Sequence, residues 1–141
     1  MEIEFKLHLQ PPTITQQEHK IGKSKSGRPY IYEPEELKDA REKLTAYLSQ
    51  YKPPREMMGP VKMMVTWLFH NPKMTKGRFR WRTRKPDTDN LQKMLKDCMT
   101  RLDFWEDDAQ VVYEVITKMD VGDPKDAGIY IKLEEMDDSE V

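Results

Sequence analysis

Apolar and polar residues alternate at the start of the chain, and this pattern predicts a strand over residues 3–9. Its apolar positions are Ile3, Phe5, Leu7 and Leu9. A period of two places these side chains on one face of an extended segment, so that face is expected to be buried. Residues 10–33 lack such a period and predict a long loop, which contains a basic, glycine- and serine-rich stretch over 20–28. A loop of this length in a small domain is usually functional or disordered.

Two segments carry apolar residues at helical spacing. In the first, Leu44 and Leu48 follow Pro34, which is tolerated in the first turn of a helix, and prolines and a glycine over 53–60 end the element. The second has a longer apolar stripe, made of Leu91, Met94, Leu95, Cys98, Met99 and Leu102. Asp89 is the expected N-cap of this helix, because its carboxylate can accept hydrogen bonds from the first backbone N–H groups.

Four further strands are predicted, over residues 61–69, 79–84, 111–119 and 129–133. The element order is therefore β-α-β-β-α-β-β, which favours an α+β fold: a two-layer sandwich with two helices packed on a mixed sheet. Phe79 and Trp81 alternate with arginines, so their strand should have one apolar face and one arginine face. We expect one domain over residues 1–134 and an acidic, frayed tail over 135–141.

The composition suits a single soluble domain. The chain has 141 residues, of which 37% are apolar and 35% are charged. No apolar run reaches the ~18 residues of a membrane span, and the first residues lack the basic and apolar regions of a signal peptide. Cys98 is the only cysteine. It excludes an internal disulfide and favours a reducing, cytoplasmic location, with Cys98 itself filling the apolar face of the second helix.

The charges are strongly divided along the chain, although the net charge is only −1. Seven basic residues and no acidic residue lie between Lys73 and Lys85. From Asp103 to the end there are 13 acidic residues and three basic ones. A protein that binds nucleic acid needs a local basic surface rather than a basic average, so the distribution is compatible with that function.

Four aspartates flank the second predicted helix in two pairs. Asp87 and Asp89 precede the helix at positions i and i+2, which point the same way in an extended segment. Asp107 and Asp108 follow it and open the next strand, which can return beside the first pair. Clustered carboxylates repel one another unless a cation joins them, and hard oxygen ligands favour Mg²⁺ or Mn²⁺. These residues are therefore candidate metal ligands; the alternative for each is an ordinary helix cap or turn residue.

Basic residues beside the acidic pairs indicate a phosphate substrate. Lys93 lies one turn after Asp89 and can project toward the same end of the helix, where it could hold a phosphate; otherwise it forms a surface pair with Asp97. The candidate DNA contacts are Lys85, Arg78, Arg80, Arg82 and Arg84, with Lys20, Lys23, Lys25 and Arg28 of the predicted loop. A run of charge is often only a solvated surface, but arginines that lead into an acidic motif favour a metal-dependent enzyme acting on nucleic acid.

The chain resembles the RusA family of Holliday-junction resolvases, which are small endodeoxyribonucleases often carried by phages and prophages. The resemblance lies in Lys85-Pro-Asp-Thr-Asp-Asn-Leu-Gln-Lys93, in Asp97, and in Phe104-Trp-Glu-Asp-Asp-Ala-Gln-Val-Val112. It is specific over residues 84–119 and extends over 1–70 by the order of the elements. It implies that Asp87, Asp89 and Asp108 are the essential carboxylates, with Lys93 as the essential lysine.

The same resemblance implies a homodimer that uses Mg²⁺, or Mn²⁺ in its place, to cut four-way DNA junctions by paired nicks. The chain departs from the simplest members in its longer N-terminal loop, its acidic tail and its near-neutral charge. These departures leave open a branched-DNA or flap nuclease of lower selectivity. A non-catalytic DNA-structure-binding protein with the same fold is a further alternative, which would need the loss of a carboxylate or of Lys93, and both kinds of residue are present.

Overall fold

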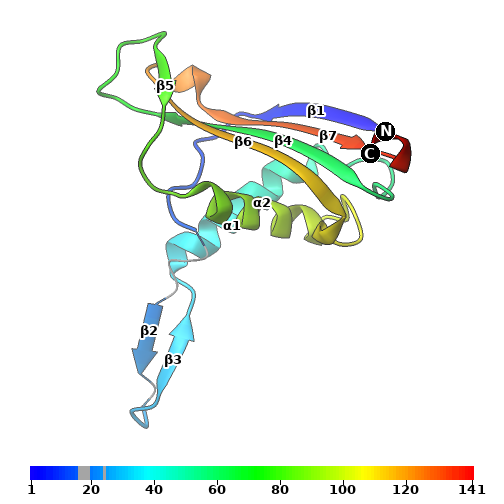
Figure 1. The fold of residues 1–141 in the computed structure, drawn as a ribbon. Coiled ribbons are helices and arrows are strands. Elements are labelled where there is room, and N and C mark those ends of the chain that lie inside the picture. The colour runs from blue at the N-terminus through cyan, green and yellow to red at the C-terminus, as the bar shows by residue number, and fades with distance from the viewer. Residues whose placement is uncertain (16–19, 24) are drawn as a thin grey trace.

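The computed structural model describes residues 1–15, 20–23 and 25–141. Its main body has a sheet on one side and two helices on the other (Figure 1). The sheet consists, in spatial order, of β1 (Glu2–Leu7), β7 (Gly128–Glu135), β4 (Val61–His70), β6 (Val111–Val121) and β5 (Phe79–Trp81). The helices are α1 (Glu35–Ser49) and α2 (Thr88–Arg101).

The sheet is mixed, as the sequence predicted. The strands β4 and β6 run parallel, while every other neighbouring pair in the sheet is antiparallel. The parallel pair needs a crossover connection, and the segment between its two strands contains β5 and α2. The α+β class and the packing of both helices on a mixed sheet are therefore confirmed.

The segment predicted as a long loop contains a hairpin instead. Strands β2 (Lys20–Lys23) and β3 (Pro29–Tyr32) pair antiparallel and form a small sheet of their own. The turn between them includes Gly27 at φ +83°, a conformation that favours glycine. Figure 1 shows the hairpin projecting away from the main body beyond the start of α1. The short strands carry too few alternating apolar residues for periodicity to reveal them.

Both predicted helices are present, but the start of α2 differs from the prediction. Asp87, rather than Asp89, occupies the N-cap position, and its side chain makes no capping hydrogen bond. Asp89 lies inside the first helical turn, where a carboxylate is stabilised by the helix dipole. The carboxylate of Asp87 therefore does not cap the helix, while that of Asp89 accepts a hydrogen bond from the backbone N–H of Asn90 at 3.0 Å. None of the helices in the described part of the chain is long and apolar enough to cross a membrane.

The core fills the space between the helices and the sheet. Its largest fully buried side chains are Trp67, Trp105 and Phe104. Leucines of α1 and the stripe of α2 pack against alternate residues of β4, namely Val61, Met63, Val65, Trp67 and Phe69. Cys98 is buried among them as a free thiol, and burial raises its pKa.

The opposite face of the sheet is not covered by either helix, and apolar side chains lie on it. From Tyr113 onward, the pairing register places odd-numbered residues of β6 on this uncovered face and Glu114, Ile116, Lys118 and Asp120 on the helix side. Val111 precedes a register shift, pairs with Val61 and packs against the core. Tyr113 and Val115 of β6 and Met64 of β4 are exposed there. Phe79 and Trp81 of β5 are exposed as well, so the expected apolar face of that strand exists but is not buried within the chain.

Gly122 allows the end of β6 to contact the loop before β5. A Cβ atom at this position would lie 1.9 Å from the carbonyl oxygen of Thr75, so one of the two backbones would have to move. We expect Gly122→Ala to lower the free energy of unfolding in urea by about 1–3 kcal/mol. Gly77→Ala is the control, because Gly77 has open space around it but a φ of +84°; its cost should be nearer 1 kcal/mol. A Gly122→Ala protein as stable as the wild type would contradict the close approach.

Candidate active site

Residues from both predicted motifs line one shallow cavity between α2 and β6. Asp89 and Lys93 reach it from the first turns of α2, and Asp108 reaches it from the 3₁₀ turn that opens β6. The cavity has a volume of about 320 Å³, and its remaining lining residues are Gln92, Lys96, Glu114 and Ile116. The structure thus brings Asp108 of the second acidic pair beside Asp89 and Lys93, which lie four residues apart on α2.

The other two aspartates lie outside this cavity. Asp87 is half exposed, and its carboxylate is 3.2 Å from the ammonium group of Lys85. Asp107 accepts a hydrogen bond from the backbone N–H of Ala109 at 2.9 Å and caps the 3₁₀ turn. No three Asp, Glu, His or Cys residues in the described part of the chain are close enough to hold one metal ion together. A complete metal site therefore requires side-chain movement or oxygen ligands from elsewhere.

Lys93 makes a long ion pair in this structure. Its ammonium group is 3.9 Å from the carboxylate of Asp97, one turn further along α2. More than half of the Lys93 side chain is exposed, and exposed pairs of this kind contribute only ~0.3–0.5 kcal/mol. An incoming phosphate can therefore compete for this lysine at little cost.

A hydrogen-bonded group that the sequence did not reveal forms the floor of the cavity. The side chain of Gln92 is buried, accepts a hydrogen bond from the indole N–H of Trp67 at 3.0 Å and donates to Glu114 at 3.3 Å. The other carboxylate oxygen of Glu114 pairs with the ammonium group of Lys96 at 2.6 Å. Both oxygens of Glu114 are thus held in place beside Asp89. Glu114 lies on the helix side of β6 because side chains alternate along a strand. This alternation was the signal in the sequence that could have revealed Glu114.

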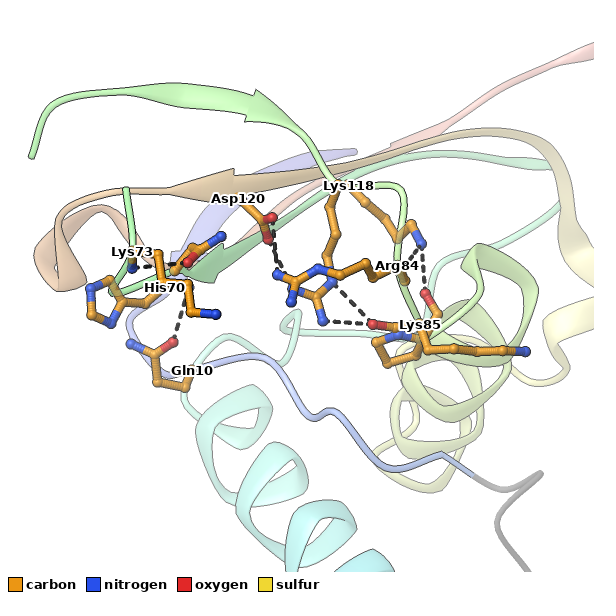
Figure 2. A network of polar contacts seen from close by, with 10 residues as sticks. Gln10, His70, Lys73, Arg84, Lys85, Lys118 and Asp120 are labelled. Carbon is orange, nitrogen blue, oxygen red and sulfur yellow. Dashed lines mark hydrogen bonds and ion pairs between the residues drawn. The ribbon is translucent and has the colours of Figure 1, made fainter. Parts of the chain in front are cut away.

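A second polar network holds the segment that leads into α2 (Figure 2). The carboxylate of Asp120, almost fully buried on β6, pairs with Arg82 at 2.8 Å and with Arg84 at 3.2 Å. Arg82 also donates to the carbonyl oxygen of Lys85 at 2.6 Å. Lys118, two residues before Asp120, donates to the carbonyl oxygens of Arg84 and Pro86. These bonds connect β6 to the backbone immediately before the first acidic pair.

Burial would raise the pKa of Asp120, but its hydrogen bonds and ion pairs with Arg82 and Arg84 outweigh that effect and hold the pKa below its usual range. The pKa of Lys118 is lowered as well, by desolvation together with the neighbouring charge of Arg82. The network is therefore held together most strongly where the carboxylate is ionised.

The candidate DNA-binding residues fall into three groups. Arg80 and Arg84 line a groove of about 740 Å³ beside β5, and Arg78 and Lys85 are exposed nearby. Arg82 also reaches this groove, but its side chain is only 9% exposed and lies over the ring of Phe69, 4.2 Å from the ring centre. The third group is in the hairpin, where Lys25 and Arg28 are exposed in the turn and Lys20 and Lys23 belong to β2. Arg82 is thus mainly structural, whereas Arg84 also pairs with Asp120 but keeps 62% of its side chain exposed.

The chain is similar to several known proteins. The family model described as endodeoxyribonuclease RusA matches residues 10–134. A crossover junction endodeoxyribonuclease rusA of Lactococcus phage r1t is 36% identical over 115 residues, which cover 80% of this chain and 85% of the relative. The crossover junction endodeoxyribonuclease RusA of Escherichia coli K12 is 53% identical over a shorter segment of 38 residues, 27% of this chain and 32% of the relative. The uncharacterized protein YqaN of Bacillus subtilis is 30% identical over 115 residues, 74% of this chain and 80% of the relative.

This chain therefore belongs to the RusA family of endodeoxyribonucleases. The resemblance recognised in the two acidic motifs is confirmed. Residues 10–134 include the hairpin, both helices and the strands β4 to β6, so the family covers the whole candidate site.

Replacing Asp120 by Asn should destabilise the protein, because Arg82 would remain largely buried without a charged partner. We expect a loss of roughly 3 kcal/mol in the free energy of unfolding at neutral pH, measured in urea. The ionised carboxylate contributes this stability above its unfolded pKa, near 3.8, and the contribution is lost as the pH falls through the lower folded pKa. The difference in the free energy of unfolding between the wild type and the Asp120→Asn variant should therefore narrow at pH values below this unfolded pKa.

The control for this comparison is Asp103→Asn, because Asp103 is 63% exposed and pairs only loosely with Lys52. Its effect should stay within about 0.5 kcal/mol. If Asp120→Asn is no more harmful than Asp103→Asn, the buried network does not hold the segment in the way described.

Proposed function

We propose that this chain is a metal-dependent, structure-selective endodeoxyribonuclease that resolves Holliday junctions by paired nicks during DNA recombination and repair. The observation that carries the proposal is the shared cavity of Asp89, Lys93 and Asp108. Membership of the RusA family, and relatives named crossover junction endodeoxyribonucleases, support it. Branched DNA, and a four-way junction in particular, is the proposed substrate.

The proposed cofactor is Mg²⁺, with Mn²⁺ as a substitute. The residues fit a hard divalent cation in type, because Asp89 and Asp108 present carboxylate oxygens to one cavity. Asp87 is the proposed third ligand, reached by exchanging its exposed contact with Lys85, and Asp107 is a weaker candidate because it caps the 3₁₀ turn. When bound, the ion would polarise the scissile phosphate and lower the pKa of a water molecule.

The lysines of the site would act on the phosphate itself. Lys93 can leave its 3.9 Å contact with Asp97 and hold a non-bridging oxygen, where its charge stabilises the negative charge that develops during hydrolysis. Lys96 is less available, since it pairs with Glu114 at 2.6 Å on the floor of the cavity. Lys93 therefore has the catalytic part in this proposal.

The exposed basic residues would hold the DNA backbone on either side of the cut. Arg78, Arg80, Arg84 and Lys85 follow one another into the acidic motif, so a strand that crosses them is directed toward the cavity. The basic hairpin, with Lys20, Lys23, Lys25 and Arg28, projects from the body and would contact a more distant part of the junction (Figure 1). Arg82 would act indirectly, by holding the backbone of this segment.

Two further parts of the proposal concern assembly and location. Symmetric resolution needs two opposed cuts, and each chain offers one candidate site, so we infer a homodimer whose two-fold symmetry matches that of the junction. The reaction is placed in the cytoplasm, where the buried free thiol of Cys98 would stay reduced.

Replacing either cavity aspartate by Asn should abolish cleavage, since the change removes a ligand charge while keeping the side-chain shape. We expect Asp89→Asn and Asp108→Asn to lose roughly 10³-fold in Mg²⁺-dependent cleavage of a mobile four-way junction, a loss of several kcal/mol in transition-state stabilisation. Junction binding, measured without Mg²⁺ by gel shift, should remain. Mn²⁺ binding, followed by electron paramagnetic resonance, should weaken in both variants.

Asp107→Asn is the matched control, because Asn can also cap the 3₁₀ turn. It should keep most of the cleavage activity, and the reverse result would exchange the roles of Asp107 and Asp108. Full activity in Asp89→Asn would refute the proposed site. The same assay on a flap substrate distinguishes a resolvase from a less selective nuclease, which would cut both substrates at similar rates.

Phosphate contacts by the exposed arginines should appear in the salt dependence of binding. Each phosphate neutralised contributes about 0.9 to the slope of log affinity against log salt concentration. The double variant Arg78→Ala/Arg80→Ala should therefore have a flatter slope and weaker binding to junctions of any sequence. The control, Lys52→Ala/Arg101→Ala, removes the same charge near the C-terminal ends of the two helices and should keep the wild-type slope. Equal slopes in the two double variants would remove Arg78 and Arg80 from the DNA surface.

A further inference from the structure

Strand β6 has a long edge that no other described strand covers. It runs from Val111 to Val121, but β5 pairs only with residues 119–121. Arg82 extends this pairing by one backbone hydrogen bond, from its N–H to the carbonyl oxygen of Lys118 at 3.1 Å. Figure 1 shows β6 as the outermost strand over the rest of its length. Residues 112–117 are therefore an open edge of the sheet.

The backbone groups that point outward along this edge can be identified. Lys118 accepts from the β5 side, and Gly122 donates to Arg78 on that same side at 3.0 Å. Since direction alternates along a strand, even-numbered residues of β6 direct their N–H and C=O groups away from β4. Glu114 and Ile116 are thus the residues whose backbone groups are offered to a partner.

The edge carries little of the usual protection against pairing: a register shift marks a bulge beside Val112 and Glu114 points to the helix side, but no other charged residue lies on it. Residues 112–117 are Val-Tyr-Glu-Val-Ile-Thr, without proline, glycine or lysine. Val112 and Tyr113 are exposed by 62% and 47%. The other edge of the sheet, β1, has Glu2, Glu4 and Lys6 on its uncovered face, which is a common defence against edge-to-edge pairing. The two edges of the same sheet therefore differ in the number of charged residues that protect them from pairing.

We propose that a second copy of this chain pairs antiparallel along the open edge of β6, with the two-fold axis at Val115. This inference rests on the homodimer of the proposed function and names its interface. The length of the edge favours a second copy, because β5 limits it at one end and the 3₁₀ turn at the other, and an identical strand has the same limits. The pairing is isologous, so one open edge closes the other and no further edge remains to extend the assembly.

The pairing register of the two β6 strands follows from the charges of their side chains and from the backbone groups that are already hydrogen-bonded. An axis at Val115 places Glu114 opposite Ile116 of the partner subunit, so that each carboxylate faces an apolar side chain. An axis at Glu114 would place two like charges directly opposite each other, which is destabilising. An axis at Ile116 would bring Glu114 to Lys118, whose carbonyl oxygen already accepts from Arg82, and would leave only the central Ile116 pair free. With the axis at Val115 the same limit is met one pair further out, where Val112 faces Lys118, so both Glu114–Ile116 pairs remain free.

The interface joins the two candidate active sites. Glu114 and Ile116 both line the cavity that contains Asp89 and Asp108. Pairing at this edge extends the two sheets into one and places both cavities on its helix side, next to the two-fold axis. Two nicks of opposite polarity, close to the branch point, are the cuts that this arrangement favours.

Val115 and Met64 provide a matched pair of positions for the test. They are register partners on the uncovered face, with exposures of 38% and 37%, but only Val115 lies on the edge strand. Two aspartates on the axis would stand only about 4.5 Å apart in their Cα atoms. Val115→Asp should therefore make the protein monomeric at micromolar concentration in light scattering, while Met64→Asp should remain at twice the chain mass of 16.8 kDa. Thermal unfolding shows whether either variant fails to fold.

Cross-linking provides a second measurement that does not weaken the interface. Val115→Cys should form an intermolecular disulfide under mild oxidation, because residues facing each other on the axis lie within the Cα range of about 4.4–6.8 Å that disulfides need. Met64→Cys should not cross-link. The native Cys98 is buried and serves as an internal control for specificity.

Each outcome has one meaning. Dimers in both aspartate variants, or cross-linking at Met64 but not at Val115, would overturn the edge interface while leaving the homodimer in place. A monomeric wild-type protein would overturn both the interface and the dimer. Junction cleavage measured on the same samples decides the proposed nuclease function separately, since it depends on Asp89 and Asp108 and can be present or absent in either case.

Discussion

The buried carboxylate of Asp120 is the constraint on which the candidate site depends. A charge so far removed from water is stable only while it is paired, and here Arg82 and Arg84 supply the partners. Arg82 and Lys118 then hold three successive backbone carbonyl groups, those of residues 84–86. The path of the chain into α2 follows from these bonds. The acidic motif is therefore placed by side chains on another strand rather than by its own local sequence.

The polar groups of the site lie on the helix side of β6, where a core would ordinarily be apolar. They are tolerated because each has a partner: Gln92 satisfies the indole of Trp67, and Glu114 is held by both Gln92 and Lys96. Tyr113 and Val115 lie on the opposite, uncovered face, while Ile116 shares the helix side with the polar groups. This reversal gives the cavity rigid carboxylate and amide groups, and it leaves the other face apolar. Both consequences come from a single alternation along β6.

The relation between chemistry and assembly is set by the same strand. Asp108 lies in the 3₁₀ turn that leads into β6, and Glu114 and Ile116 lie on β6 itself, so this strand contributes both residues of the cavity and the edge offered to a partner. In the proposed dimer, a change in the pairing of β6 would move both cavities together.

Local periodicity was sufficient to predict both helices, most strands of the sheet and the α+β class, because backbone preference and the burial of a stripe act over a few residues. The two acidic pairs and Lys93 were also visible, since their spacing is a local property. Tertiary structure alone decided that Arg82 serves the fold rather than the surface. It also decided that Glu114 and Gln92 belong to the cavity, and that the alternation of β6 turns its charged side inward. Those outcomes depend on partners more than 20 residues away in the sequence, whose positions no pattern along the chain encodes.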